Sequence, residues 1–176
     1  AKSAQVPFSG WLPRAMEGPT PSSAIFYGAI SVHLGPYLLL RIEPVLASSP
    51  AASAAVIAVG LATAMMGTLL HRVMSDAKAS IAYAAMTQLG VIFIEIGLGF
   101  PRLALLHIIG HATVRTLQFL RAPSILHDYH RVHAAAGGHV AATGSHFERI
   151  LPEGFRLWLY RAALDHGFLD VLTSRD

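Results

Sequence analysis

The sequence contains no cysteine and little charge, and both absences narrow the range of functions. Without a thiol, the chain has no disulfides, cysteine-bound iron–sulfur clusters, cysteine zinc sites or thiolate nucleophile. Only 13% of its 176 residues are charged, whereas soluble domains usually carry about a quarter. Because 53% of the residues are hydrophobic, the composition is typical of a protein that lies in lipid.

Long apolar runs with almost no charge define the expected architecture. A bilayer-crossing helix needs about 20 apolar residues, and four runs reach that length: about 20–41, 51–72, 80–100 and 103–120. A half-helix is expected before them at 6–17, and Gly35 and Pro36 should weaken or kink the first span. The sequence therefore predicts an all-α, polytopic transmembrane helix bundle.

The two ends of the chain differ from its apolar middle. The sequence starts at Ala1 without the apolar segment of a signal peptide, so we expect the chain to begin inside a longer product. Residues 122–176 are polar and rich in His and Gly, which predicts a cytoplasmic loop followed by an interfacial amphipathic helix near 155–172. The spacing of His127, Asp128 and His130 resembles a metal-ligand pair, but loop histidines without a metal are the favoured interpretation.

Basic residues near the span ends predict an orientation in the membrane. With four spans, both ends of the segment share one side, where most of these residues fall: Lys2, Arg14, Arg72, Lys78, Arg121 and Arg131. Only Arg41 and Arg102 lie near the opposite side. Since basic residues concentrate on the cytoplasmic side, we predict cytoplasmic ends, in a bacterial inner membrane or an equivalent energy-transducing membrane. The scattered basic residues do not indicate nucleic-acid binding.

The fourth span carries a row of ionisable residues. His107, His111 and Arg115 are spaced four residues apart, which places them along one stripe of a helix. Ionisable groups at membrane depth are costly unless they pair or face water, so the stripe should not face lipid. Histidine, with an unperturbed pKa of about 6.5, is suited to proton relay. The stripe favours a proton path, and a packing pair of histidines or a bound metal are the alternatives.

Three other ionisable residues lie in or beside the spans. Glu95 lies within the third span and needs a proton or a cationic partner, which Arg102 or a residue of the fourth span could provide. A structural role for Glu95 near the helix end fits its position equally well. Lys78 and Lys2 precede apolar segments, and by position alone they are expected to be interfacial anchors.

Four stretches carry a family resemblance: Lys-Ser-Ala-Gln-Val-Pro from Lys2, Trp-Leu-Pro from Trp11, Ala-Met-Glu-Gly-Pro-Thr-Pro from Ala15 and Gln-Leu-Gly from Gln88. Over roughly residues 1–120 the chain resembles the antiporter-like membrane subunits of respiratory complex I, of the subunit L or chain 5 type. Members of this family have well over ten transmembrane helices. The resemblance therefore implies that the chain corresponds to the middle of such a subunit.

The resemblance also implies roles for single residues. Lys2 matches the lysine of the family's broken helix, which is central to proton transfer. His107 and His111 match the family's central histidines, and Lys78 matches the lysine at the start of a later helix.

Three positions depart from the family pattern before it disappears after Leu120. Tyr27 stands where a connecting histidine is common, Arg115 where lysine is common, and Glu95 where an apolar residue is usual. Because its guanidinium gives up a proton only with difficulty, arginine is a poor proton carrier. We therefore expect Arg115 to act as an electrostatic element, with Glu95 as its candidate partner.

These features predict a proton-translocating membrane subunit of a complex I-like respiratory or related ion-pumping complex. Protons would pass via Lys2 and His107/His111, and the charge of Lys78 would tune the proton affinity of these sites. The chain would be a non-catalytic subunit of a translocase, without a cofactor or a redox or hydrolytic site, because it has no glycine-rich dinucleotide turn. Quinone, flavin and iron–sulfur clusters would belong to partner membrane subunits or their neighbours. The alternatives are a membrane subunit of a proton-coupled inorganic carbon transporter of the DAB type, and a non-pumping structural scaffold from the same family.

Overall fold

The computed structural model describes residues 2–17, 19–74, 77–122 and 152–164. Every regular element in this part of the chain is helical: α1 (Trp11–Arg14), η1 (Ala15–Glu17), α2 (Thr20–Ser23), η2 (Ala24–Ile30), η3 (Ser31–His33), α3 (Leu34–Arg41), α4 (Glu43–Ala47), α5 (Pro50–Val73), α6 (Ala77–Gly97), α7 (Pro101–Arg121) and α10 (Glu153–Leu164). Four helices are long and apolar enough to cross a membrane: Pro21–Arg41, Pro50–Val73, Ala77–Gly97 and Pro101–Arg121. The predicted all-α bundle with four spans is confirmed.

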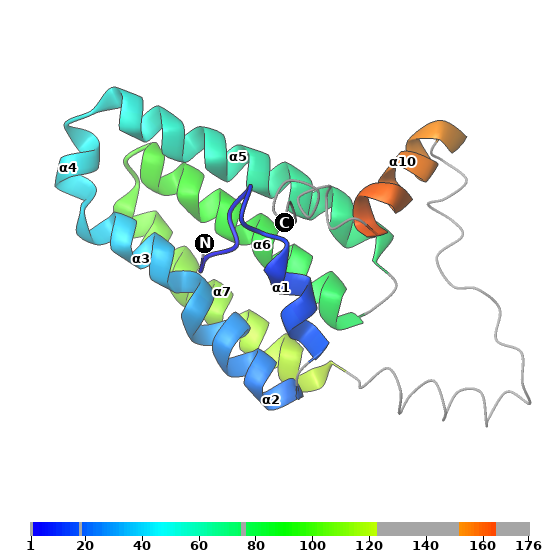
Figure 1. Cartoon of the computed structure of the whole chain (residues 1–176). Coiled ribbons are helices and arrows are strands. Elements are labelled where there is room, and N and C mark those ends of the chain that lie inside the picture. Colours follow the sequence, from blue (N-terminus) through cyan, green and yellow to red (C-terminus); the bar gives the residue numbers. More distant parts are fainter. Residues whose placement is uncertain (1, 18, 75–76, 123–151, 165–176) are drawn as a thin grey trace, which may run out of the picture.

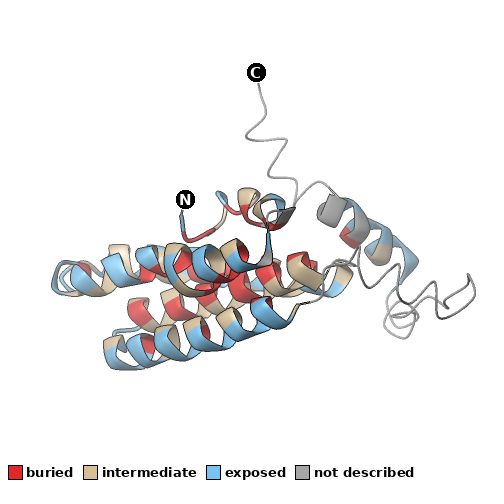
Figure 2. Cartoon of the chain, turned by 90° about the horizontal axis from the view of Figure 1, so that it is seen from below, coloured by how far each residue is buried: buried red, intermediate tan, exposed pale blue. Residues whose placement is uncertain are grey.

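The four spans lie side by side (Figure 1). Helix α6 is the most buried of them. Its Tyr83, Met86, Leu89 and Ile92 are all at most 2% exposed and form the centre of the apolar core. Buried residues gather where the helices face one another, while their outer surfaces are exposed (Figure 2). An apolar outer surface on long helices fits contact with lipid or with other membrane helices.

Helices α5 and α6 pack backbone against backbone. A Cβ added to Gly90 would lie 2.5 Å from the carbonyl oxygen of Gly60, and one added to Gly60 would lie 2.6 Å from that of Gly90. Such close approach is possible only for small residues, which are typical of helix contacts in membranes.

The first span is irregular. It passes from α2 into the π-helical η2 and the 3-10 segment η3 before the regular helix α3 begins. Pro36 has no N–H to donate to the carbonyl of Val32, and its ring crowds that carbonyl. The irregular stretch therefore lies just before Gly35 and Pro36, the residues expected to weaken or kink this span.

The segment before the first span is less helical than expected. Residues 6–10 form turns instead of the first part of the half-helix predicted at 6–17, and α1 begins at Trp11. Polar groups of this segment bind neighbouring spans: Val6 N donates to Thr63 Oγ1 at 3.0 Å, and Gly35 N donates to Ser3 Oγ at 2.9 Å. Because protein groups satisfy its backbone, a non-helical segment can lie among the spans.

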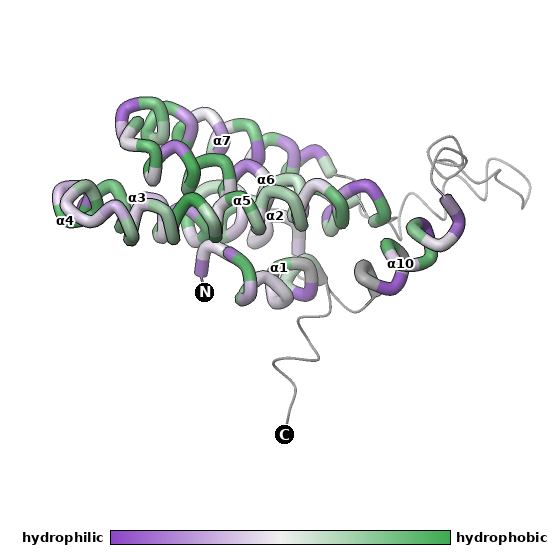
Figure 3. The backbone as a smooth tube through the Cα atoms, turned by 90° about the horizontal axis from the view of Figure 1, so that it is seen from above, coloured by the Kyte–Doolittle hydropathy of each residue, from purple (hydrophilic) through white to green (hydrophobic). Residues whose placement is uncertain are grey.

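The region expected to hold a loop and an amphipathic helix is described only in part. Helix α10 lies against α5 and buries Leu159, and Figure 3 shows hydrophilic and hydrophobic residues interleaved along it. Residues 165–172 of the expected helix lie outside the described residues, as do His127, Asp128 and His130.

Candidate functional site

The ionisable stripe of α7 faces the other helices, as its spacing predicts. His111 is buried, with 6% of its surface exposed, whereas Leu106 and Ile109 on the outer side are 68% and 57% exposed. Hydrophilic residues recur along α7 in Figure 3. The helix therefore turns its apolar side outward and its titratable side toward α6 and η2.

His111 contacts a second buried histidine, on the first span. Its Nδ1 lies 2.8 Å from Nε2 of His33, and the two rings meet edge to face with centroids 5.0 Å apart. Nδ1 of His33 lies 3.1 Å from the carbonyl oxygen of Ala29. His111 is central in Pro101–Arg121 and His33 is near the middle of Pro21–Arg41, so the pair lies at mid-depth of the bundle.

Sequence reasoning did not single out His33. It is the only histidine in the run 20–41, but a neutral histidine adds nothing to a count of formal charge. The signal that could have identified it is the presence of a titratable side chain deep in an apolar span.

A second cluster forms around His107, where α6 and α7 pack near their shared turn. Nδ1 of His107 lies 2.9 Å from Oε1 of Glu95, and Nε2 lies 3.1 Å from Oε1 of Gln88. The other carboxyl oxygen of Glu95 is buried and has no hydrogen-bond partner among the described residues. The ring centroids of His107 and His111 are 6.4 Å apart, so the two clusters are neighbours.

The expected pairing of Glu95 with Arg115 is not found. Arg115 donates from Nε to His111 Nε2 at 3.4 Å and from Nη1 to Gln118 Oε1 at 2.6 Å. Glu95 lies near the end of α6, where the antiparallel α7 presents His107, and Arg115 is about 12 Å further along α7. The antiparallel packing therefore gives Glu95 a histidine partner.

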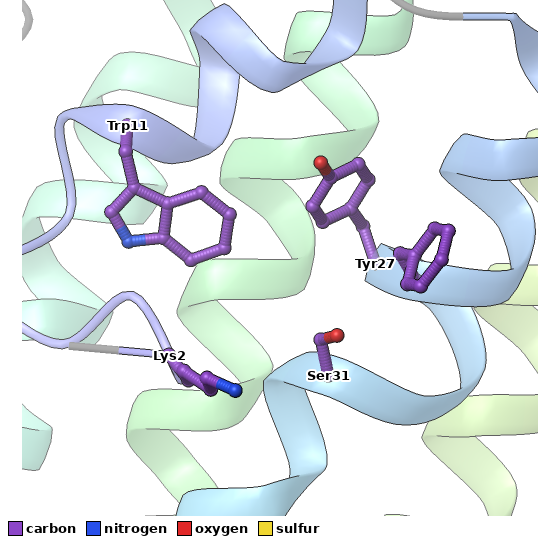
Figure 4. A pocket seen from close by; sticks show the side chains of 5 residues that line it. Lys2, Trp11, Tyr27 and Ser31 are labelled. Atoms are coloured by element: carbon purple, nitrogen blue, oxygen red, sulfur yellow. The ribbon is translucent and has the colours of Figure 1, made fainter.

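Lys2 lies in a separate pocket of ≈ 320 Å³ lined by Lys2, Trp11, Phe26, Tyr27 and Ser31. In Figure 4 its amine points toward Ser31, and the rings of Trp11 and Tyr27 lie above it, 5.8 Å apart. Ser31 and His33 are two positions apart in a 3-10 helix, so their side chains point about 120° apart. The structure thus places Lys2 and the histidine pair on different sides of the same irregular helix.

Lys78 is distant from both clusters. It lies in the first turn of α6, about 15 Å along the helix axis from Gln88. The structure therefore brings together His107, His111, Arg115 and Glu95 from the predicted set, adds His33, and leaves Lys2 and Lys78 apart from them.

The metal alternative for the α7 stripe gains no support. Within residues 2–17, 19–74, 77–122 and 152–164, no group of three or more His, Cys, Asp or Glu side chains is arranged to hold a metal ion. Each ring nitrogen of His107 and His111 instead has one hydrogen-bond partner, as in a chain of hydrogen bonds.

Comparison with known proteins gives a consistent family. Residues 1–137 match the family model described as NADH:quinone oxidoreductase/Mrp antiporter, TM. The chain is 42% identical over 132 residues to NAD(P)H-quinone oxidoreductase subunit 5, chloroplastic, of Ranunculus macranthus, which covers 75% of this chain and 18% of that protein. It is 43% identical over 127 residues to the Nuphar advena protein of the same name, covering 72% of this chain and 17% of that protein.

The chain thus spans less than a fifth of the length of the relatives that it matches. The matched residues include all four apolar helices and both histidine clusters. With its polytopic helical fold and this match over more than half of its length, the chain is an integral membrane protein and belongs to the NADH:quinone oxidoreductase/Mrp antiporter family.

Proposed function

We propose that the chain is part of a proton-translocating membrane subunit of a complex I-like respiratory or related ion-pumping complex. The observation that carries the proposal is the row of neighbouring titratable side chains through the bundle interior. It runs from Glu95 near the α6–α7 turn through His107 to His111 at mid-depth. In this proposal Lys2 and the pair His107/His111 carry protons.

The physical support comes from the cost of such residues in a membrane. Ionisable side chains at this depth are rare and usually mark ion paths, because hydrocarbon offers them no solvation. The three residues that face His107 and His111 from neighbouring elements, Gln88, Glu95 and His33, are all polar, where apolar side chains would satisfy packing alone. A scaffold would not need this set of interhelix contacts.

Arg115 and Lys78 act in this proposal through their charge. Arg115 lies beside His111 and keeps its proton, so it sets the local field without carrying protons. Lys78 lies at the far end of α6, where a charge acts on the path only over a long range. Lys2 faces a pocket with room for several water molecules, at about 30 Å³ each, which can link it to the rest of the path.

The coupled reaction would take place in partner subunits. The relatives are named as subunits of NAD(P)H-quinone oxidoreductase, and we propose that this chain likewise works beside other membrane subunits, with its ends on the cytoplasmic side. Quinone, flavin and iron–sulfur chemistry would belong to those partners. Co-purification with a soluble zinc subunit in place of redox subunits would instead favour an inorganic carbon transporter.

The test is proton flux in sealed vesicles that contain the intact parent complex, under a fixed driving reaction. His111→Ala should lower the flux at least about tenfold while the complex stays assembled, since positioned proton carriers typically contribute 10²–10⁴-fold. The matched control is His71→Ala on α5, an exposed histidine bonded to Ser80, which should leave the flux unchanged. Normal flux in the assembled His111→Ala complex would favour the scaffold.

A further inference from the structure

The contacts around His33 and His111 fix which nitrogen of each ring carries the hydrogen. The carbonyl oxygen of Ala29 can only accept, so the hydrogen of a neutral His33 lies on Nδ1. Nε2 of His33 is then an acceptor, and Nδ1 of His111, 2.8 Å away, must be the donor.

The third contact agrees with this assignment. If the hydrogen of His111 lies on Nδ1, its Nε2 is an acceptor, and the group facing it is Nε of Arg115, which can only donate. All three hydrogen bonds therefore point the same way, from Arg115 through His111 and His33 to Ala29. With both tautomers reversed, the contact between the rings would still be a hydrogen bond, but two acceptors would face each other at Ala29 and two donors at Arg115.

We propose that His33 is a third proton-carrying histidine, which accepts the proton of His111, and that Arg115 is a positioning residue that sets the direction of the transfer. The proposal rests on the proton-translocating function proposed above. It adds a site on the first span and a crossing point from α7 to η3. The other titratable groups facing the pair, within the described part of the chain, are His107 and Arg115.

The transfer conserves protons. Arg115 leaves Nε2 of His111, and its guanidinium keeps a partner in Gln118. An incoming proton binds Nε2 of His111, the N–H bond at its Nδ1 breaks, and a new N–H bond forms at Nε2 of His33. His111 is left neutral with its hydrogen on Nε2, and His33 becomes an imidazolium whose Nδ1–H donates to Ala29.

His33 lies in the segment of the first span that also borders the Lys2 pocket. The same short 3-10 segment carries Ser31, which lines the pocket of Lys2. The irregular stretch η2–η3 also contains Ala29, the acceptor for His33. Departures from regular α-helix of this kind are frequent at functional sites. The His33–His111 pair and the Lys2 pocket thus share one short segment of the first span, on different sides of it.

The decisive variant is His33→Gln in the full-length protein within its native membrane complex. A glutamine can still accept a hydrogen bond from His111, but it cannot take up the proton, so proton flux should fall at least about tenfold with assembly retained. His71→Gln is the matched control and should leave the flux unchanged. Wild-type flux in the assembled His33→Gln complex would overturn the proposal.

Measuring His111→Ala in the same vesicles separates the two proposals. Loss of flux in His111→Ala with normal flux in His33→Gln would overturn the role of His33 alone, whereas normal flux in both would also overturn the proton-path function. A second measurement reads the hydrogen positions directly. In nitrogen-15 spectra of the labelled wild-type protein, His33 and His111 should both carry their hydrogen on Nδ1. In Arg115→Leu, the hydrogen of His111 should be redistributed between its two nitrogens. A hydrogen on Nε2 of His33 at rest would overturn the proposal, even if His33→Gln failed to assemble.

Discussion

Glu95 and His107 form the contact that joins α6 to α7 near their shared turn. Glu95 is 15% exposed and His107 is 23% exposed at the side chain, so water screens this pair less than it would screen a surface pair. The resemblance places an apolar residue at the position of Glu95, and the structure shows what the carboxyl does here. It provides the hydrogen-bond partner for His107, the first imidazole of the proposed path.

Removing that acceptor should destabilise the bundle. In Glu95→Ala the part-buried Nδ1–H of His107 loses its partner, and we expect the free energy of unfolding to fall by about 1–3 kcal/mol. Glu95→Gln keeps an oxygen that can accept and should lose clearly less. Unfolding of the full-length protein by dodecyl sulfate in mixed micelles measures both. Equal losses in the two variants would show that the charge of Glu95, and not its role as acceptor, stabilises the contact.

For single residues, the sequence predicts where a side chain points better than it predicts which residue that side chain contacts. Helical spacing alone puts His107, His111 and Arg115 on one face, because the period of the helix fixes where a side chain points. The partner of each depends on how far a neighbouring helix is shifted along α7, which spacing does not determine. For that reason Glu95 meets His107 instead of Arg115, and the contact of His111 with His33 is visible only in the structure.

At the scale of helices, the α5–α6 contact is the most closely packed part of the bundle. Gly60 and Gly90 face each other there, and neither has room for a Cβ without a shift of backbone. The run 51–72 is rich in Ala and Gly, which suits close packing of helices in lipid. Gln88 and Glu95 lie on the other side of α6, where they contact His107 of α7, so the position of the His107 cluster depends on where α5 holds this helix.

Gly90→Ala tests this dependence. Its new Cβ would lie 2.5 Å from a carbonyl oxygen, so the helices must separate, and we expect a loss of about 1–3 kcal/mol in the free energy of unfolding. Gly110→Ala on α7 is the control, because a Cβ there meets nothing within 4 Å and alanine favours a helix by up to about 1 kcal/mol. The same micelle titration compares them. A Gly90→Ala protein as stable as Gly110→Ala would contradict the close packing.

At the scale of the whole molecule, the number of spans follows directly from the sequence. The uncharged runs are long enough to reveal each crossing, and their observed ends differ from the predicted ones by a few residues at turns such as Leu98–Phe100, where Pro101 starts α7. The irregular segment before α1 was less predictable, since its conformation depends on hydrogen bonds to distant spans.

The four crossings make a prediction about sides that needs no activity measurement. The α4–α5 turn at Ser48 follows the first span and the α6–α7 turn at Leu98 follows the third, so the two turns must share one side of the membrane. Met74 follows the second span and Ala122 the fourth, so both lie on the other side.

Single cysteine substitutions test this arrangement, because the chain has no cysteine of its own. The variants Ser48→Cys, Leu98→Cys, Met74→Cys and Ala122→Cys are each treated with a membrane-impermeant thiol reagent, with the unsubstituted protein as the blank. Because basic residues concentrate near the ends, we expect Met74→Cys and Ala122→Cys to react from the cytoplasmic side and the other two from the opposite side. The reverse pattern would refute the predicted orientation alone. Labelling of Ser48→Cys and Leu98→Cys from different sides would refute the four-span arrangement, and with it the mid-depth position of the His33–His111 pair.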